Sequence, residues 1–184
     1  MSSDRLILAA GAAFIHAILS RFFISFLSEM TTRPETGTVL VATLLALINF
    51  ALFTFVFTIL KRLFNERYHL RELDLPILAL IGLNGLGVGL TLLPLLGFGP
   101  SSLSWLFGGM GVATGLAWLA LAVQLFRLPS ATLAFQKPYA WLIAAAGVSF
   151  VSIRLIALGV ILGAIADLLL GVILYKESGK PISF

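Results

Sequence analysis

Long apolar stretches fill most of this 184-residue chain and constrain its fold more than any other feature. A helix needs about 20 mostly apolar residues to cross a hydrocarbon core of about 30 Å. Four stretches meet this requirement: residues 6–27, 38–60, 76–96 and 103–126. Charged residues or Gly/Pro turns follow each of them, at residues 33–37, 61–74, 97–102 and 127–138. We therefore expect at least four transmembrane helices.

The last apolar stretch, residues 139–175, is too long for one span. As a single helix it would run roughly 55 Å at about 1.5 Å per residue, well beyond the hydrocarbon core. A break near Ser152, Ile153 and Arg154 divides it into helices over 139–153 and 155–175. A re-entrant or strongly tilted fifth segment is the alternative. The sequence thus predicts an all-α, polytopic transmembrane bundle of six spans, forming a single integral membrane domain over residues 1–184.

Composition excludes several classes of protein. Hydrophobic residues make up 60% of the chain and charged residues only 11%, against about 25% charged in a soluble domain, so soluble enzymes, nucleic-acid binders and disordered regulators are set aside. Without cysteine, the chain has no thiolate nucleophile, iron–sulfur cluster or Cys-based zinc site. No phosphate loop, zinc-protease motif or nucleophile elbow is present. We expect neither a cofactor nor a metal, and no enzymatic activity.

The distribution of basic residues predicts the orientation. Nine of the twelve fall on the side that carries both termini if there are six spans: Arg5, Lys61, Arg62, Arg67, Arg71, Arg127, Lys137, Lys176 and Lys180. Cytoplasmic loops carry an excess of Lys and Arg, so both termini are predicted to be cytoplasmic. Short loops with this bias favour a bacterial-type inner membrane.

Aromatic residues are predicted to mark the two membrane interfaces. Tyr139, Trp141 and Tyr175 are predicted at the inner interface and Trp105 near the outer one. Trp118 lies away from both boundaries and is expected in the core. The stripe formed by Phe50, Phe53 and Phe57 is interpreted as structural, either facing lipid or filling gaps.

Small residues mark the expected contact faces of two helices, because small side chains let membrane helices approach closely. In the last span, Gly159, Gly163 and Gly171 repeat in steps of four or eight, and Asp167 falls in the same row. In the first span, a matching stripe consists of Ala9, Ala13 and Ala17. Asp167 is therefore predicted to face protein rather than lipid.

Four polar residues are predicted to share one depth. At about 1.5 Å per residue from the nearest cytoplasmic end, His16 lies roughly 15 Å deep, Asn49 roughly 18 Å, and Asn84 and Asp167 roughly 12 Å. An ionisable residue at the bilayer centre is by default a functional candidate. We expect a proton- or solute-binding site with Asp167 as the titrating carboxylate and His16 as its partner. The alternative is that the four hydrogen-bond one another and only hold the bundle together.

Two arginines fall toward the outer side of the predicted bundle. Arg21 and Arg154 are expected to extend to the headgroups. Alternatively, they form an anion-attracting vestibule above the polar cluster.

In size, in six-span topology with both ends inside, and in the Ala9, Ala13 and Ala17 stripe, the chain resembles the substrate-binding components of energy-coupling-factor vitamin transporters. The resemblance is architectural and covers no ligand motif, so it assigns no binding residue. It implies that the alanine stripe docks a transmembrane coupling subunit.

The sequence favours a small integral membrane protein for transport or solute binding. The alternative is a non-catalytic subunit of a larger membrane complex, whose Gly and Ala faces bind another membrane protein or a second copy of the chain. A lipid-modifying intramembrane enzyme is disfavoured because acid, base and metal ligands do not cluster. The lipid bilayer is an expected partner in every case, and nucleic acid in none.

Overall fold

A computed structural model describes residues 2–32, 35–129, 132–152 and 154–180. The fold is all-α, as predicted. In chain order, its elements are α1 (Ser3–Thr32), α2 (Thr36–Arg67), α3 (Asp74–Leu90), the short 3₁₀ helix η1 (Leu93–Leu96), α4 (Pro100–Arg127), α5 (Gln136–Val151) and α6 (Ile156–Ser178). Five of the six predicted apolar segments each correspond to one α-helix, and the third is divided between α3 and η1.

The division of residues 139–175 into two helices is confirmed. The helix α5 ends at Val151 and α6 begins at Ile156, with Ser152 capping the end of α5 through its backbone N–H. Ile153, at the centre of the predicted break, lies outside the described residues.

The third predicted segment, residues 76–96, is not one continuous helix. The helix α3 ends at Leu90, and Thr91 and Leu92 turn the chain into η1. Pro94 lacks the N–H that would bond to residue 90, and its ring would collide with that carbonyl, so an α-helix cannot continue through it. Gly97 then ends η1 with a left-handed backbone conformation (φ 86°), which glycine adopts without strain.

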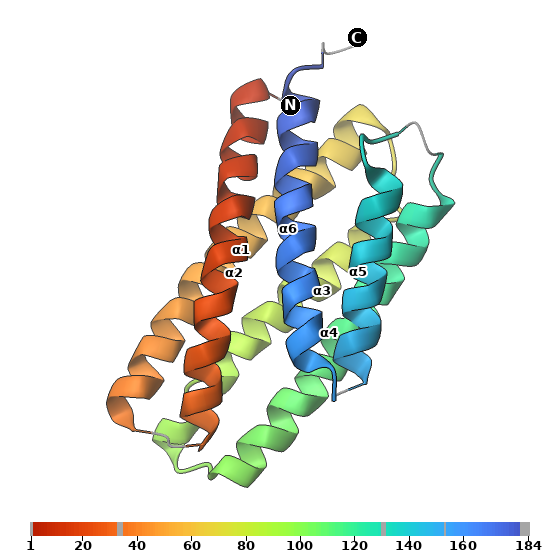
Figure 1. The fold of residues 1–184 in the computed structure, drawn as a ribbon. Coiled ribbons are helices and arrows are strands. Elements are labelled where there is room, and N and C mark those ends of the chain that lie inside the picture. The colour runs from red at the N-terminus through yellow and green to blue at the C-terminus, as the bar shows by residue number, and fades with distance from the viewer. Residues whose placement is uncertain (1, 33–34, 130–131, 153, 181–184) are drawn as a thin grey trace.

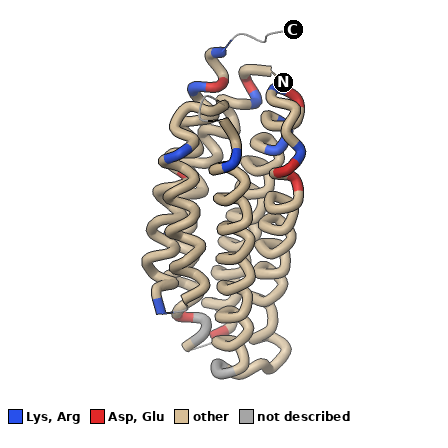
Figure 2. Tube along the Cα trace, turned by 90° about the vertical axis from the view of Figure 1, so that its right-hand side faces the viewer, with Lys and Arg blue, Asp and Glu red and all other residues tan. Residues whose placement is uncertain are grey.

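The six α-helices form a closed ring (Figure 1). Each helix packs against the next one in the chain, and α6 closes the ring by packing extensively along α1. Both termini lie at the same end of the bundle, beside the segments that connect α2 to α3 and α4 to α5. Most Lys and Arg residues lie at this end (Figure 2), which we call the terminal end.

Four helical segments are long and apolar enough to cross a membrane: 3–29, 36–67, 102–127 and 156–178. The helix α3 is apolar but shorter, with 17 residues, and α5 has 16, which gives each about 25 Å of length. The bundle is therefore of the membrane-embedded kind by length and composition.

The half of the ring near the terminal end is filled with apolar side chains. Phe57 and Phe53 stack with their ring centroids 4.2 Å apart, and Trp118 meets Phe57 edge-on at 5.6 Å. All three are buried, which confirms the core position predicted for Trp118 and the gap-filling interpretation of this part of the phenylalanine stripe. Tyr139 was predicted at the interface, but the structure buries it fully, since α5 turns this face toward the centre of the ring. Trp105, Trp141 and Tyr175 are exposed, at 82%, 68% and 62%.

The predicted small-residue faces have different roles. Ala9, Ala13 and Ala17 are buried within the chain, on the helix α1 that packs against α2 and α6. The stripe is thus covered by other parts of the chain and does not present the docking surface that the resemblance implied. A Cβ built on Gly171 would come within 3.2 Å of the Ala10 carbonyl, and one on Gly159 within 3.3 Å of the Ala146 carbonyl, so these two glycines allow close helix packing. Gly163 borders open space instead.

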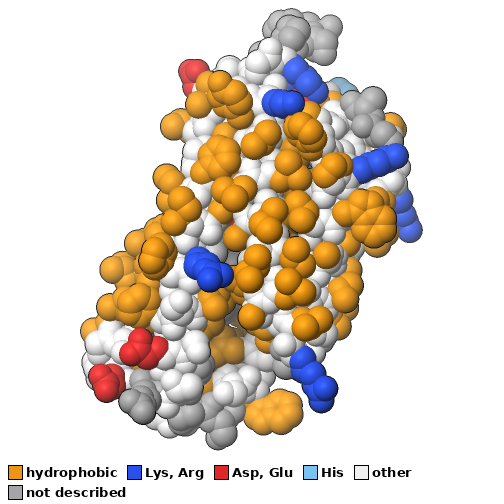
Figure 3. All heavy atoms as spheres, viewed as in Figure 1, with side chains coloured by type: hydrophobic (Ala, Val, Ile, Leu, Met, Phe, Trp, Pro, Cys, Tyr) orange, Lys and Arg blue, Asp and Glu red, His pale blue; other side chains and the backbone are white. Residues whose placement is uncertain are grey.

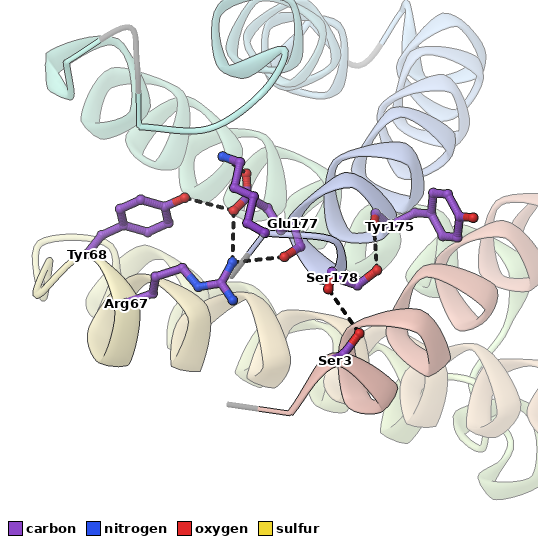
Figure 4. A network of polar contacts seen from close by, with 7 residues as sticks. Ser3, Arg67, Tyr68, Tyr175, Glu177 and Ser178 are labelled. Atoms are coloured by element: carbon purple, nitrogen blue, oxygen red, sulfur yellow. Dashed lines mark hydrogen bonds and ion pairs between the residues drawn. The ribbon is translucent and has the colours of Figure 1, made fainter. Parts of the chain in front are cut away.

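A polar network ties together the two chain ends and α2 (Figure 4). Glu177 is fully buried and accepts hydrogen bonds from Arg67 Nη1 (3.2 Å) and the Tyr68 hydroxyl (2.8 Å), while Lys180 pairs with its other oxygen. Ser3 donates to the Ser178 carbonyl at 2.9 Å. The network fixes the C-terminal end of α6 on α2 and α1, and so positions the rest of α6 in the ring.

Removing the Tyr68 hydroxyl is expected to weaken this network. Burial, followed by the bond to Glu177, raises the pKa of the Tyr68 phenol. The Tyr68→Phe variant should be less stable by about 1 kcal/mol at pH 7, the usual net value of one hydrogen bond. Because the folded state holds the phenol proton more tightly, this contribution is complete below pH ~10 and declines as the pH rises further.

Thermal unfolding in detergent at several pH values measures both effects. Equal stability of the two proteins at pH 7, or a difference that grows above pH ~10, would contradict the assignment.

Candidate functional site

The half of the ring away from the terminal end is hollow. It encloses a cavity of about 510 Å³ that all six α-helices line. The lining residues of α1 come from its second half, between His16 and Ser28, and those of α6 from its first half, between Ile156 and Asp167. Figure 3 shows the surface hollowed between these two half-helices. The cavity therefore reaches the surface in the half opposite the basic residues.

His16 and Asp167 meet at the inner end of this cavity. The Nδ1 atom of His16 lies 2.9 Å from Oδ2 of Asp167, and the two side chains are 12% and 9% exposed. Gly171, one turn after Asp167, packs against Phe14 and the Ala10 carbonyl of α1. This close contact of α1 with α6 brings together two residues that are 151 positions apart in the sequence.

The geometry of the pair defines its proton chemistry. With Asp167 ionised, the carboxylate can only accept, so His16 donates through Nδ1 and its Nε2 is left as the second titratable position. The imidazole can then carry one proton or two, and the net charge of the pair is −1 or 0. Among the described residues, the bond from His16 is the one hydrogen bond that Asp167 makes. A carboxylate with unused accepting capacity at a cavity is able to bind a proton or a hydrogen-bond donor.

Asn49 and Asn84 line the same cavity, as the depth estimate suggested they would. Each donates from Nδ2 to the carbonyl four residues earlier in its own helix, Leu45 or Leu80, at 3.0 Å. The Asn49 side-chain oxygen is buried and accepts no hydrogen bond from the described residues. The structure thus brings all four predicted polar residues to one cavity, but only His16 and Asp167 bond to each other.

The two arginines do not belong to the cavity lining. Arg21 and Arg154 are both exposed, and the lining residues include neither of them. Arg21 is five positions after His16, which turns it by about 140° around the helix axis from His16. The exposed position fits side chains that extend to headgroups. The vestibule alternative stays a prediction.

Aromatic residues make up a large part of the remaining lining, which sequence patterns did not identify. Phe53 and Trp118 lie at the inner end, where the ring of Phe53 is 5.5 Å from that of His16. Further aromatic residues along the cavity are Phe23, Phe50, Phe107 and Phe150. Two residues of the predicted phenylalanine stripe, Phe50 and Phe53, line the cavity. Helical spacing alone does not distinguish a cavity wall from a packed core.

Metal binding has little support at this site. Within the described ranges, no group of three or more His, Cys, Asp or Glu side chains is placed to hold a metal ion. His16 and Asp167 supply two ligands, whereas zinc sites usually need three or four from the protein.

Comparison of the chain with protein-family models, with curated proteins and with solved structures finds no match. Its function is therefore inferred from its own residues and their arrangement.

Proposed function

We propose that this chain is a small integral membrane protein for transport or solute binding, with the cavity as its site and the His16–Asp167 pair as its reactive centre. The observation that carries the proposal is that the cavity collects the hydrogen-bonded His16–Asp167 pair and two asparagines from four different helices. Helix packing alone needs no such opening, since protein interiors are normally packed with few voids larger than a water molecule. Intramembrane carboxylates are costly and are typically kept for function.

The proposed placement in the membrane follows from the distribution of charge. All six helices cross, and the terminal end with its basic residues faces the cytoplasm of a bacterial-type inner membrane. The cavity then opens on the outer side or into the outer leaflet, with His16 and Asp167 near the middle of the bilayer. The short helices α3 and α5 cross by local thinning of the bilayer, which costs fractions of a kcal/mol per Å.

Proton handling follows from the same pair. A solute that donates a hydrogen bond to Asp167 and a proton that binds Asp167 use the same carboxylate, which lies 2.9 Å from His16. Binding of solute and of protons is thereby linked at one site. This linkage is the minimum that a proton-coupled transporter requires.

The experiment compares Asp167→Asn with the wild-type protein in liposomes under an imposed pH gradient. Asparagine keeps the size of the side chain but neither ionises nor binds a proton, so proton flux should fall to the level of protein-free liposomes. The matched control is Asp4→Asn, which makes the same chemical change on an exposed residue outside the cavity. This control should keep the wild-type flux.

The opposite outcome identifies the alternative function. Unchanged flux in Asp167→Asn, together with loss of proteins that co-purify with the wild type, would contradict a transport site. It would instead indicate a subunit of a larger complex in which Asp167 only supports assembly.

A further inference from the structure

We infer that the solute is a small organic cation, with an ammonium group that binds Asp167 and an apolar body that fills the aromatic part of the cavity. This inference rests on the proposed function and specifies its substrate class. Three properties of the lining support it: its charge, its hydrogen-bonding groups and its aromatic surface.

The charge of the lining is never positive while Asp167 is ionised. No Lys or Arg belongs to the described lining, and Asp167 and His16 are its charged or titratable members. The net charge of the lining is therefore −1 with neutral His16 and 0 with protonated His16. An anionic solute would meet no compensating charge in a low-dielectric site, whereas a cation would neutralise the carboxylate.

The charged group of the lining that has free hydrogen-bonding capacity is an acceptor, the carboxylate of Asp167. The amide orientation of Asn49 is fixed by chemistry, because only the nitrogen can donate to the Leu45 carbonyl, and the oxygen is then left without a partner. In Asn84, as in Asn49, one of the two amide N–H groups donates to a helix carbonyl, that of Leu80. The Asn49 oxygen has almost no accessible surface, so the acceptor that a ligand can reach is the second carboxylate oxygen of Asp167. An ammonium group has three donors and no acceptor.

The aromatic surface beside the carboxylate favours the same class. Phe53 contacts the ring of His16, and Trp118 lies edge-on to Phe53 with centroids 6.3 Å apart. Aromatic faces attract cations as well as apolar groups, and this attraction increases when water is excluded. A cavity of about 510 Å³ lies within the size range of small-molecule sites, so an ammonium group with an aromatic or aliphatic body fits it.

The test uses three probes that share one body and differ in the end group: 2-phenylethylamine, 2-phenylethanol and 3-phenylpropionate. Binding is measured by calorimetry at neutral pH, with the protein in nanodiscs and empty nanodiscs as the blank for partition into lipid. We expect the amine to bind at least about ten times more tightly than the alcohol, as one charge-assisted hydrogen bond would give, and the carboxylate to bind most weakly. In Asp167→Asn the preference for the amine should disappear, whereas Asp4→Asn should keep it.

Each other outcome overturns the inference. Equal binding of the amine and the alcohol, tighter binding of the carboxylate, or an amine preference that survives in Asp167→Asn excludes recognition of a cation by this residue. Absence of amine binding does so as well. The proposed function is then judged separately: binding of the alcohol or carboxylate, or proton flux that depends on Asp167, would retain the solute site with a different class of ligand.

Discussion

Replacing Gly163 with leucine is expected to abolish solute binding while leaving the bundle folded. Gly163 lines the cavity, and a Cβ built on it meets no atom within 4 Å, so the new side chain enters open space. It lies one turn from Asp167 on the same face of α6 and would occupy the volume beside the His16–Asp167 pair. A ligand forced to overlap it should lose at least about a hundred-fold in affinity, or roughly 2.7 kcal/mol.

The stability of the Gly163→Leu variant should be equal to or higher than that of the wild type. Leucine is a better helix former than glycine by up to about 1 kcal/mol, and it buries apolar surface in the cavity. The matched control is Gly82→Leu on α3, where the built Cβ also meets nothing within 4 Å and the residue does not line the cavity. Binding is followed by calorimetry and stability by thermal unfolding. Wild-type affinity in Gly163→Leu would exclude the cavity as the binding site.

The largest loss of stability is expected from Gly115→Ala. At this position α4 and α5 are in backbone contact, and an added Cβ would lie 2.6 Å from the Gly147 carbonyl oxygen. The obstacle is main chain and cannot rotate away, so the two helices must separate. We expect a cost of about 3 kcal/mol, the upper part of the range for overpacking, measured as a lower unfolding temperature in detergent.

Gly109→Ala is the control for this substitution. It lies on the same helix, α4, and the built Cβ there has open space around it. Alanine should stabilise that position by up to about 1 kcal/mol through its higher helix propensity. The account of the α4–α5 contact fails if Gly115→Ala and Gly109→Ala have the same stability.

The helices were largely predictable because they follow the length of the apolar stretches. The similar depth of His16 and Asp167 was predictable because it follows the number of residues from the end of each helix. Apolar stretches of about 20 residues define where helices form, and a constant rise per residue places His16 and Asp167 at similar depths. The four-residue repeat of Gly159, Gly163 and Gly171 also placed Asp167 on a face toward protein, and its side chain is indeed 9% exposed. These inferences need no knowledge of how the helices are arranged.

What could not be predicted depends on the arrangement of the helices. The cavity is lined by side chains of all six α-helices, and no residue pattern reports how far apart neighbouring helices lie. Gly147 has no periodic partner in α5, so its contact with Gly115 was not recognisable. Glu177 lies in a short charged segment that resembles a solvated tail, yet tertiary contacts with Arg67 and Tyr68 bury it.

The most direct test of the solute site is native mass spectrometry of the protein released from its own membrane. We expect the wild type to retain a non-covalently bound small molecule other than lipid, and Gly163→Leu to lack it, with Gly82→Leu matching the wild type. A wild-type protein without any such ligand, or the same ligand bound equally to Gly163→Leu, would contradict the proposal that this cavity is a solute site.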